Sequence, residues 1–322
     1  MTSIGIIGEC MIELSRAEGH ANNSDLYQKR YGGDTYNTAY YISQCVKSDP
    51  NSSANSVLKK DIGVNYITAL GDDEISEDMI ATFARAGVQT NLIERVPGAV
   101  PGLYTIQTDD QGERSFLYWR SQSPARRLFQ TDTTGDLMSS LLKHDWLYFS
   151  GITLAILYPE GRRKLFELCK EFRAQGGKVA FDINYRPRLW ENIEEARDVI
   201  NQAYDVCDLA LPSYDDEVLL FEVTNPTEAI NRIRDHGAKE IVLKNGSKEL
   251  SIYFDKNIQE FSVTPAILVK DTTSAGDSFN AGYIYARLMG KPVTKAADIA
   301  GQLARQVIAQ VGAIVPIMPP TL

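Results

Sequence analysis

The sequence predicts an α/β fold in which a mainly parallel sheet carries helices on both faces. Short apolar runs alternate along the chain with segments of helical periodicity, which is typical of parallel sheets. Two further stretches, 12–31 and 102–120, contain polar and aromatic strand patterns and predict a small separate β-sheet. With 322 residues, 43% of them hydrophobic, the chain can bury a large core. We expect a single domain over residues 1–322, with the small sheet inserted in it.

The expected strands and helices follow one another in order from the N-terminus. Six short apolar runs predict buried strands, at 3–7, 65–69, 146–150, 178–182, 209–211 and 240–244. Five segments between them repeat apolar residues at helical spacing, at 35–46, 77–86, 160–175, 193–204 and 226–236. Another helical pattern begins at Phe279, after the apolar stretch 266–269 and a loop. The polar segment 48–60 predicts a surface loop, to which we assign no function.

The composition argues against several classes of function. The chain has 33 basic and 42 acidic residues, a formal charge of −9, and no long basic run, so nucleic-acid binding is not expected. No apolar stretch reaches transmembrane length, and residues 1–8 predict a buried strand rather than a signal peptide, so no membrane partner is expected. The spacing of the cysteines favours reduced thiols and a cytoplasmic location over a zinc site: Cys10, Cys45, Cys169 and Cys207.

The most informative run is Asp271–Gly282, where a loop becomes a helix. The first backbone amides of a helix have no partner within it, and the positive end of the helix dipole lies there. Ser274, Ala275 and Gly276 carry little side chain that could block an anion, so the run predicts a phosphate site. Asp277 cannot attract a phosphate, but its carboxylate can accept a proton from an attacking hydroxyl. A simple helix cap is the alternative interpretation.

This run resembles the C-terminal signature of the ribokinase-type (PfkB) sugar kinases, in which glycine usually stands at the position of Ser274. The resemblance implies a ribokinase-like three-layer αβα fold, with Asp277 as catalytic base and the backbone amides of residues 274–277 as an anion hole. It also implies that the strands within 12–31 and 102–120 form a β-sheet lid. Such a lid closes over the sugar, excludes water and often pairs between subunits. We therefore expect a homo-oligomer, a dimer formed through the lid.

A pair of glycines and the helix start that follows them form the second motif, Gly32–Ala39. Paired glycines permit a tight turn and the close approach of a ligand to the backbone. Asp34 and Asn37 fall near the first helical turn, where Asn37 can both donate and accept hydrogen bonds. A glycine turn with an aspartate cap explains the segment equally well. The matching family segment lies on the acceptor-sugar side, and this resemblance implies that Gly33, Asp34 and Asn37 contact the substrate.

The third motif, Asp182–Arg188, follows an expected strand. Loops at the carboxyl ends of parallel strands form the ligand crevice of open α/β sheets, and Asn184 and Arg186 fall in such a loop. The run is similar to a sugar-kinase element that reaches both the sugar and the phosphates. This similarity implies that Asn184 contacts ATP and that Arg186 contacts both ATP and the sugar. Arg188 is interpreted as an exposed surface charge.

Aromatic and basic residues mark the strands of the expected lid, at Tyr104, Tyr118 and Arg120. Because side chains of a strand alternate between faces, Tyr118 and Arg120 share one face. Arginine binds a carboxylate through two parallel hydrogen bonds, which lysine cannot do. Arg120 and Arg186 directed at one pocket would suit an acidic sugar better than a neutral one. An ordinary exposed strand face is the alternative interpretation of the Tyr-x-Arg pattern.

The nucleotide is expected at the turn that follows the strand 240–244. Lys244, Gly246 and Ser247 resemble the family segment whose turn wraps the phosphates and ribose of ATP. The helix start at 274–276 is expected to contact ATP as well. The chain has neither a Gly-x-x-x-x-Gly-Lys-Ser/Thr loop nor a Gly-x-Gly-x-x-Gly fingerprint, which argues against Walker-type NTPases and ordinary dinucleotide-binding proteins.

The residues that would order Mg²⁺ depart from the family pattern. Many members carry an Asn-x-x-Glu motif where this chain has Ser213 and Asp216. We expect Ser213 to contact ATP, and Asp216, or Glu217 as a substitute, to order the Mg²⁺–phosphate group. A direct protein ligand is not required, because Mg²⁺ commonly keeps several waters and binds through the phosphates of ATP.

The resemblance covers nearly the whole chain and is strongest to family members that act on 2-keto-3-deoxygluconate (KDG), a sugar acid. The matching runs are 8–13, 32–37, 101–104, 118–120, 150–152, 182–190 and 271–282. The implied reaction moves the γ-phosphoryl group of Mg·ATP to the C6 hydroxyl of KDG and gives 2-keto-3-deoxy-6-phosphogluconate. Two alternatives stay open: a kinase for another sugar or sugar acid, such as a fructokinase, and a non-catalytic sugar-binding protein on a kinase fold.

Overall fold

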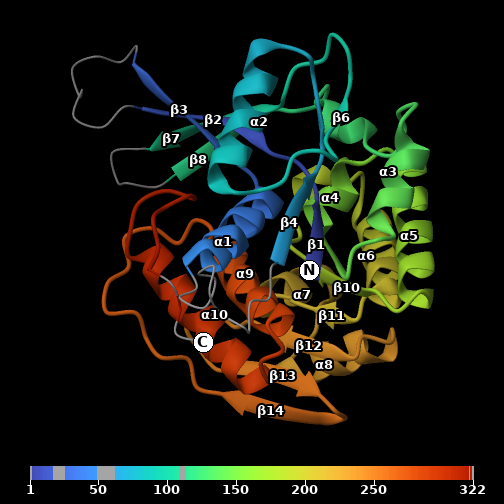
Figure 1. Ribbon diagram of the computed structural model, residues 1–322. Coiled ribbons are helices and arrows are strands. Elements are labelled where there is room, and N and C mark those ends of the chain that lie inside the picture. Colours follow the sequence, from blue (N-terminus) through green and yellow to red (C-terminus); the bar gives the residue numbers. More distant parts are fainter. Residues whose placement is uncertain (1, 17–25, 49–61, 109–113, 319, 321–322) are drawn as a thin grey trace, which may run out of the picture.

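An eight-stranded mixed sheet forms the centre of the molecule, in the order β14-β13-β12-β11-β10-β9-β1-β4 (Figure 1). The computed structural model describes residues 2–16, 26–48, 62–108, 114–318 and 320. Six of the strands run parallel: β1 (Thr2–Ile7), β4 (Ile62–Ile67), β9 (Trp146–Ser150), β10 (Lys178–Asp182), β11 (Leu209–Ala210) and β12 (Glu240–Leu243). The last two strands at one end of the sheet, β13 (Leu250–Phe254) and β14 (Asn257–Phe261), are antiparallel. The predicted α/β fold with a mainly parallel sheet is confirmed.

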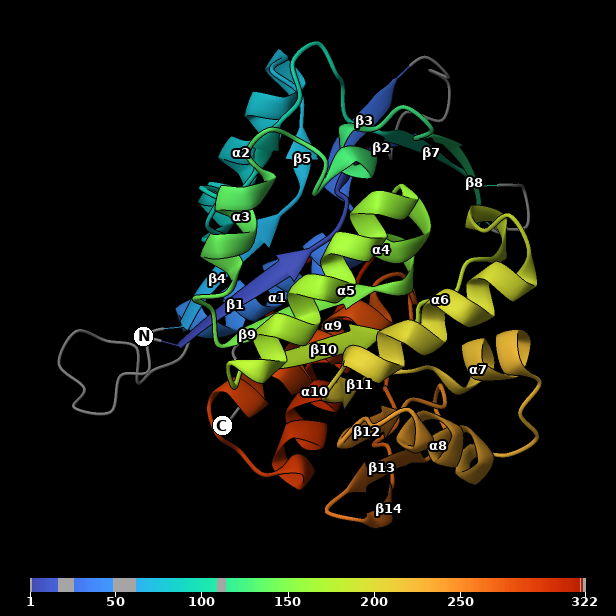
Figure 2. The ribbon, with the colours of Figure 1, turned by 90° about the vertical axis from the view of Figure 1, so that its right-hand side faces the viewer.

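Helices pack on both faces of this sheet (Figure 2). One core includes α1 (Asp34–Ser48), α2 (Glu74–Ala86), α9 (Ala275–Leu288) and α10 (Val293–Ile308). The other includes α3 (Thr134–Leu141), α4 (Gly151–Ile156), α5 (Pro159–Ala174), α6 (Ile193–Val206), α7 (Tyr214–Phe221) and α8 (Pro226–Asp235). Neighbouring residues of a central strand enter opposite cores, because strand side chains alternate: Tyr148 of β9 packs with the first set of helices and Phe149 with the second.

A second, four-stranded sheet stands apart from the main sheet (Figures 1 and 2). Its strands lie in the order β3-β2-β7-β8 and comprise β2 (Met11–Arg16), β3 (Tyr27–Gly32), β7 (Leu103–Thr108) and β8 (Arg114–Trp119). The remaining elements are the short parallel pair β5 (Ala69–Leu70) and β6 (Glu94–Arg95), and 3-10 turns at Pro124–Arg127 and Pro187–Leu189. The small separate sheet expected from the strand patterns is therefore present.

Two expected features of this region stay predictions. Closure of the small sheet as a lid is one, and subunit pairing through it is the other; Leu117 and Trp119 of β8 are exposed apolar side chains on this sheet. Residues 109–112, within the expected strand stretch 102–120, lie outside the described residues, and so does the expected loop 48–60 from residue 49 onward. The apolar stretch 266–269 is not buried; it lies exposed in the loop before α9.

Candidate active site

The loop before α9 ends on a residue with unusual backbone geometry. Ser274 precedes the helix with φ 63° and ψ 13°, in the left-handed region, and its side chain makes no capping bond to the helix backbone. The amide of Ala275 donates to the Thr272 carbonyl, 3.1 Å away. Gly276 is exposed, and a Cβ atom added there would meet only the Lys244 ammonium, at 3.9 Å. The start of α9 therefore offers open space in front of a helix N-terminus, as an anion site requires.

Asp277 lies in the first turn of α9 and is held by two neutral donors. The Asn37 amide nitrogen, from α1, donates to its Oδ2 at 2.8 Å, and the Ser274 hydroxyl donates to the same oxygen at 2.9 Å. Enclosure of the carboxylate by protein atoms and the nearby carboxylates of Asp34 and Asp182 raise the pKa of Asp277 to about 7. A carboxylate with this pKa is suited to accept a proton near neutral pH.

Asp34, at the start of α1, is also held by hydrogen bonds. Its Oδ2 accepts from the Ser150 hydroxyl at 2.5 Å and from the Asn184 amide nitrogen at 2.9 Å. Burial raises its pKa. Gly33, the residue before it, packs so closely that a Cβ atom there would lie 2.2 Å from the Glu9 carbonyl oxygen. Only glycine fits at this position. The two hydrogen bonds of Asp34 join the start of α1 to the end of β9 and to the loop after β10.

A buried polar network joins β10, β12 and α9 beside the helix start. The Lys244 ammonium contacts Asp182 at 3.2 Å and the Asn280 side-chain oxygen at 2.9 Å, and the Asn280 amide nitrogen donates to Asp182 at 2.8 Å. Ser213 is bridged to Lys244 by β-type pairing, so its backbone lies next to this network. The turn residues Gly246 and Ser247 that follow are exposed.

A second cluster of polar side chains lies on the small sheet, where the sugar is expected to bind. The Tyr104 hydroxyl donates to Glu13, and its ring lies 5.7 Å from that of Tyr118, which is half-exposed. Arg120 follows β8, lies over the Tyr118 ring and forms a buried ion pair with Glu9. Tyr118 and Arg120 thus share a face, as the alternation predicted.

Three buried polar atoms of the site residues have no hydrogen-bond partner within the described ranges: Glu9 Oε1, Arg120 Nε and Asn37 Oδ1. A buried polar atom without a partner is costly, so each is suited to meet a polar ligand. The side-chain nitrogen of Asn37 donates to Asp277, and its side-chain oxygen is available to a donor on a ligand. Arg120 already has a carboxylate partner, which the sequence did not reveal.

Arg186, in the loop after β10, is the second arginine expected at the sugar. Its guanidinium is about half-exposed, donates to the Tyr185 carbonyl and lies 3.8 Å from Asp216. The two metal-ordering candidates differ in position. Glu217 is fully buried, pairs with Arg232 at 2.6 Å and accepts from Tyr204, so it belongs to the core. Asp216, whose pKa is raised by burial, remains at the site's edge.

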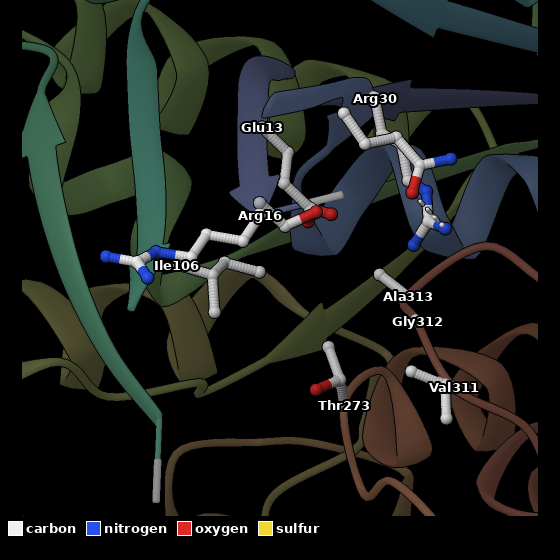
Figure 3. Close-up of a pocket in the computed structure, with 10 residues that line it drawn as sticks. Glu13, Arg16, Arg30, Ile106, Thr273, Val311, Gly312 and Ala313 are labelled. Carbon is white, nitrogen blue, oxygen red and sulfur yellow. Dashed lines mark hydrogen bonds between the residues drawn. The ribbon is translucent and has the colours of Figure 1, made fainter. Parts of the chain in front are cut away.

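A pocket of about 160 Å³ lies between the small sheet and the start of α9 (Figure 3). Glu13, Arg30 and Ile106 line it from the sheet, and Thr273 and the turn Val311–Ala313 line it from the other side. Thr273 directly precedes Ser274, so the pocket borders the proposed anion site.

Sequence reasoning missed several residues that the structure brings to this place: Glu9, Glu13, Ser150, Asp182 and Asn280. Asp182 had a signal, since it ends an apolar strand and begins the third motif. In the described part of the chain, no group of three or more His, Cys, Asp or Glu side chains is arranged to hold a metal ion. None of the helices in the described ranges is long and apolar enough to span a bilayer.

A model of the pfkB family of carbohydrate kinases matches residues 1–320. The chain is 40% identical over 318 residues to the 2-dehydro-3-deoxygluconokinase of Dickeya dadantii, covering 98% of this chain and 97% of that protein. It is 40% identical over 316 residues to the enzyme of the same name from Escherichia coli K12, covering 97% of each. The crystal structure of a PfkB protein from Polaromonas superposes with a TM-score of 0.80 at 23% identity, covering 96% of both chains.

Proposed function

Since the chain belongs to the pfkB family of carbohydrate kinases, we propose that it is a 2-dehydro-3-deoxygluconokinase, which phosphorylates KDG (2-dehydro-3-deoxygluconate) with ATP. The observation that carries the proposal is Asp277, a carboxylate whose pKa is about 7 and which stands at an open helix start. The similarity to two kinases of that name spans nearly the full length of all three chains.

The transfer needs one proton acceptor and one site for negative charge. Asp277 takes the proton from the C6 hydroxyl of KDG as the hydroxyl oxygen bonds to the γ-phosphorus and the bond to the ADP oxygen breaks. Its Oδ2 is occupied by Asn37 and Ser274, so Oδ1 is the atom that accepts the proton. The amides of residues 274–277 stabilise the phosphoryl charge; that of Ala275 is already engaged, so Gly276 and Asp277 supply most of this. Phosphoryl transfer asks mainly for such alignment and charge stabilisation.

The nucleotide is held by the residues around the polar network. Lys244, Gly246 and Ser247 line the turn for the phosphates and ribose, and Ser213 lies beside them. Asn184 and Arg186 reach the phosphates from the loop after β10. A Cβ atom at Gly276 would meet only the Lys244 ammonium, at 3.9 Å, which supports placing a phosphate group in front of this residue. Mg²⁺ bound to the ATP phosphates would neutralise part of their charge, and Asp216 is the side chain that we expect to order it.

The sugar acid is held between α1 and the small sheet. Gly33, Asp34 and Asn37 contact its hydroxyls, and Tyr104 and Tyr118 pack against it. Arg120 and Arg186 bind the C1 carboxylate. Arg120 is tightly paired with Glu9, whereas Arg186 is half-exposed and lies 3.8 Å from Asp216, beyond hydrogen-bond distance, so Arg186 is the arginine more available to an acidic substrate.

That same ion pair supports a second candidate, a kinase for a neutral sugar such as fructose. A neutral sugar needs no net positive charge in its pocket, and the Glu9–Arg120 pair provides both an acceptor and a donor for hydroxyl groups. Arg186 is what favours the acidic substrate.

Product identification tests the proposal. The protein is incubated with Mg·ATP and KDG, and the product is examined by ³¹P NMR. We expect a phosphomonoester signal coupled to the two C6 protons, and a turnover lowered by several orders of magnitude in Asp277→Asn. Phosphate on another hydroxyl would refute the C6 assignment, and a near-normal rate of Asp277→Asn would refute the base.

A further inference from the structure

The side chain of Ser274 sits where a side chain is disfavoured. At φ 63° the Cβ atom of an L-residue crowds the backbone, whereas glycine adopts this conformation readily. The other non-glycine residues with positive φ within the described ranges are Phe129, Asn184, Glu222, Asp255 and Lys256. Strain of this kind persists when the surrounding structure enforces it, and it clusters at functional sites.

The hydroxyl does not act as an ordinary helix cap. It makes no capping bond to the backbone of α9. It donates instead to Asp277 Oδ2 at 2.9 Å, and the Asn37 amide donates to the same oxygen at 2.8 Å. Two donors on one carboxylate oxygen fix the plane of the group and leave the other oxygen as acceptor. A glycine at position 274 would allow the same backbone conformation at the start of α9, but it would lack the hydrogen bond from the Ser274 hydroxyl to Asp277.

We propose that the Ser274 hydroxyl is a positioning residue for the reaction: it orients the Asp277 carboxylate with Oδ1 toward the acceptor hydroxyl and favours its ionised form. This inference rests on the proposed function. It assigns to a side chain a role separate from that of the backbone amides at the same place.

The charged surroundings of Asp277 make such a donor consequential. Asp34 from α1 and Asp182 from β10 disfavour its ionised form, as does its enclosure by protein. Burial raises the pKa of the Tyr148 hydroxyl of β9 and of the Tyr41 hydroxyl of α1, and the Asp277 charge adds to both shifts. The Lys244 ammonium lies beside the helix start and balances part of this negative charge. The hydrogen bonds from Asn37 and Ser274 act in the opposite direction to the carboxylates and lower the pKa of Asp277.

The test compares Ser274→Ala and Ser274→Gly with the unchanged protein. Both variants lack the hydroxyl, and only the glycine variant also relieves the backbone. A charge-assisted hydrogen bond of this kind corresponds to a shift of about one pH unit. We expect the acid limb of kcat/KM for KDG, measured at saturating Mg·ATP, to move up by about one pH unit in both variants. The glycine variant should melt about 2 °C above the alanine variant.

Ser278→Ala is the matched control. Its hydroxyl lies one turn along α9 and donates to the carbonyls of Ser274 and Ala275, not to Asp277. This variant should keep the acid limb of the unchanged protein. An unmoved limb in Ser274→Ala and Ser274→Gly, with or without a loss of rate, would overturn the inference, because a purely structural serine predicts that result.

Asp277→Asn separates this inference from the proposed function. If that variant keeps normal turnover, the base assignment fails and the inference fails with it. If it loses turnover while the serine variants keep the original acid limb, the proposed function stands and only the role of the Ser274 hydroxyl is refuted. A loss of turnover together with shifted limbs supports both.

Discussion

Replacing Asp277 with asparagine is expected to stabilise the protein above neutral pH while it removes the proton acceptor. The carboxyl of Asp277 is enclosed by protein and lies near Asp34 and Asp182, and its pKa rises from an ordinary 3.8 to about 7. The folded state therefore binds this proton more tightly than the unfolded state does. It follows that the unchanged protein loses stability as the pH rises from about 4 to about 7. Asparagine does not ionise, so the variant escapes this loss.

The size of the effect follows from the pKa shift. One pKa unit corresponds to about 1.4 kcal/mol, so the full shift corresponds to about 4 kcal/mol. Part of the side chain reaches solvent, which makes this the upper end of the range. Between pH 5 and pH 8 the expected change is about 3 kcal/mol. For a chain of this length it corresponds to a difference of about 4 °C in melting temperature.

Thermal unfolding followed by circular dichroism, without ATP or sugar, measures this directly. Both proteins are melted at pH 5, 6, 7 and 8, and the variant is compared with the unchanged protein at each pH, so that other titrating groups cancel. We expect the variant's advantage in melting temperature to grow with pH and to level off above pH 7. A difference that stays constant from pH 5 to pH 8 would show that Asp277 titrates alike in the folded and unfolded states. In that case Asp34, Asp182 and the enclosure by protein do not raise the pKa of Asp277.

Three further substitutions test the surroundings of this group. Glu9→Gln removes the negative partner of Arg120, so the kcat/KM ratio of KDG to fructose should rise about tenfold; an unchanged ratio would separate this pair from substrate selection. Arg186→Ala should raise the KM for KDG at least tenfold and the KM for fructose little, which steady-state kinetics with both sugars decides. Lys244→Met leaves the buried Asp182 carboxylate without an ion-pair partner and should lower the free energy of unfolding by about 3 kcal/mol in urea titrations. Lys239→Met removes an exposed lysine and should have little effect.

The central strands were predictable because they are buried on both faces. The apolar runs 146–150 and 178–182 coincide with β9 and β10, whose residues need no polar alternation. The strand expected at 65–69 in fact runs from Ile62 to Ile67 as β4. Its start was missed because Gly63 and Asn65 interrupt the apolar pattern. The hairpin β13–β14 was not predicted, since β14 is exposed and polar and has neither a buried face nor a continuous apolar run. Local sequence patterns therefore indicate which residues are buried more directly than they indicate which strands pair.

The site was predictable where its residues cluster in the sequence. Ser274 and Asp277 lie three positions apart at one helix start, and Asn37 follows a pair of glycines at another. The Glu9–Arg120 ion pair joins residues 111 positions apart, and nothing local to either residue indicates the other. For the same reason the sequence could not tell that Glu217 belongs to the core and Asp216 does not, because only tertiary packing separates two adjacent acids.

The most direct test of the proposed function is a coupled ADP-release assay with Mg·ATP and four acceptors: KDG, gluconate, fructose and ribose. We expect a kcat/KM for KDG well above those of the other three, with Asp277→Asn inactive on all of them. Turnover with a neutral sugar alone would contradict the assigned substrate and the role of Arg186, and would leave the base assignment standing. No turnover with any acceptor would contradict the kinase assignment and would favour a sugar-binding protein on this fold.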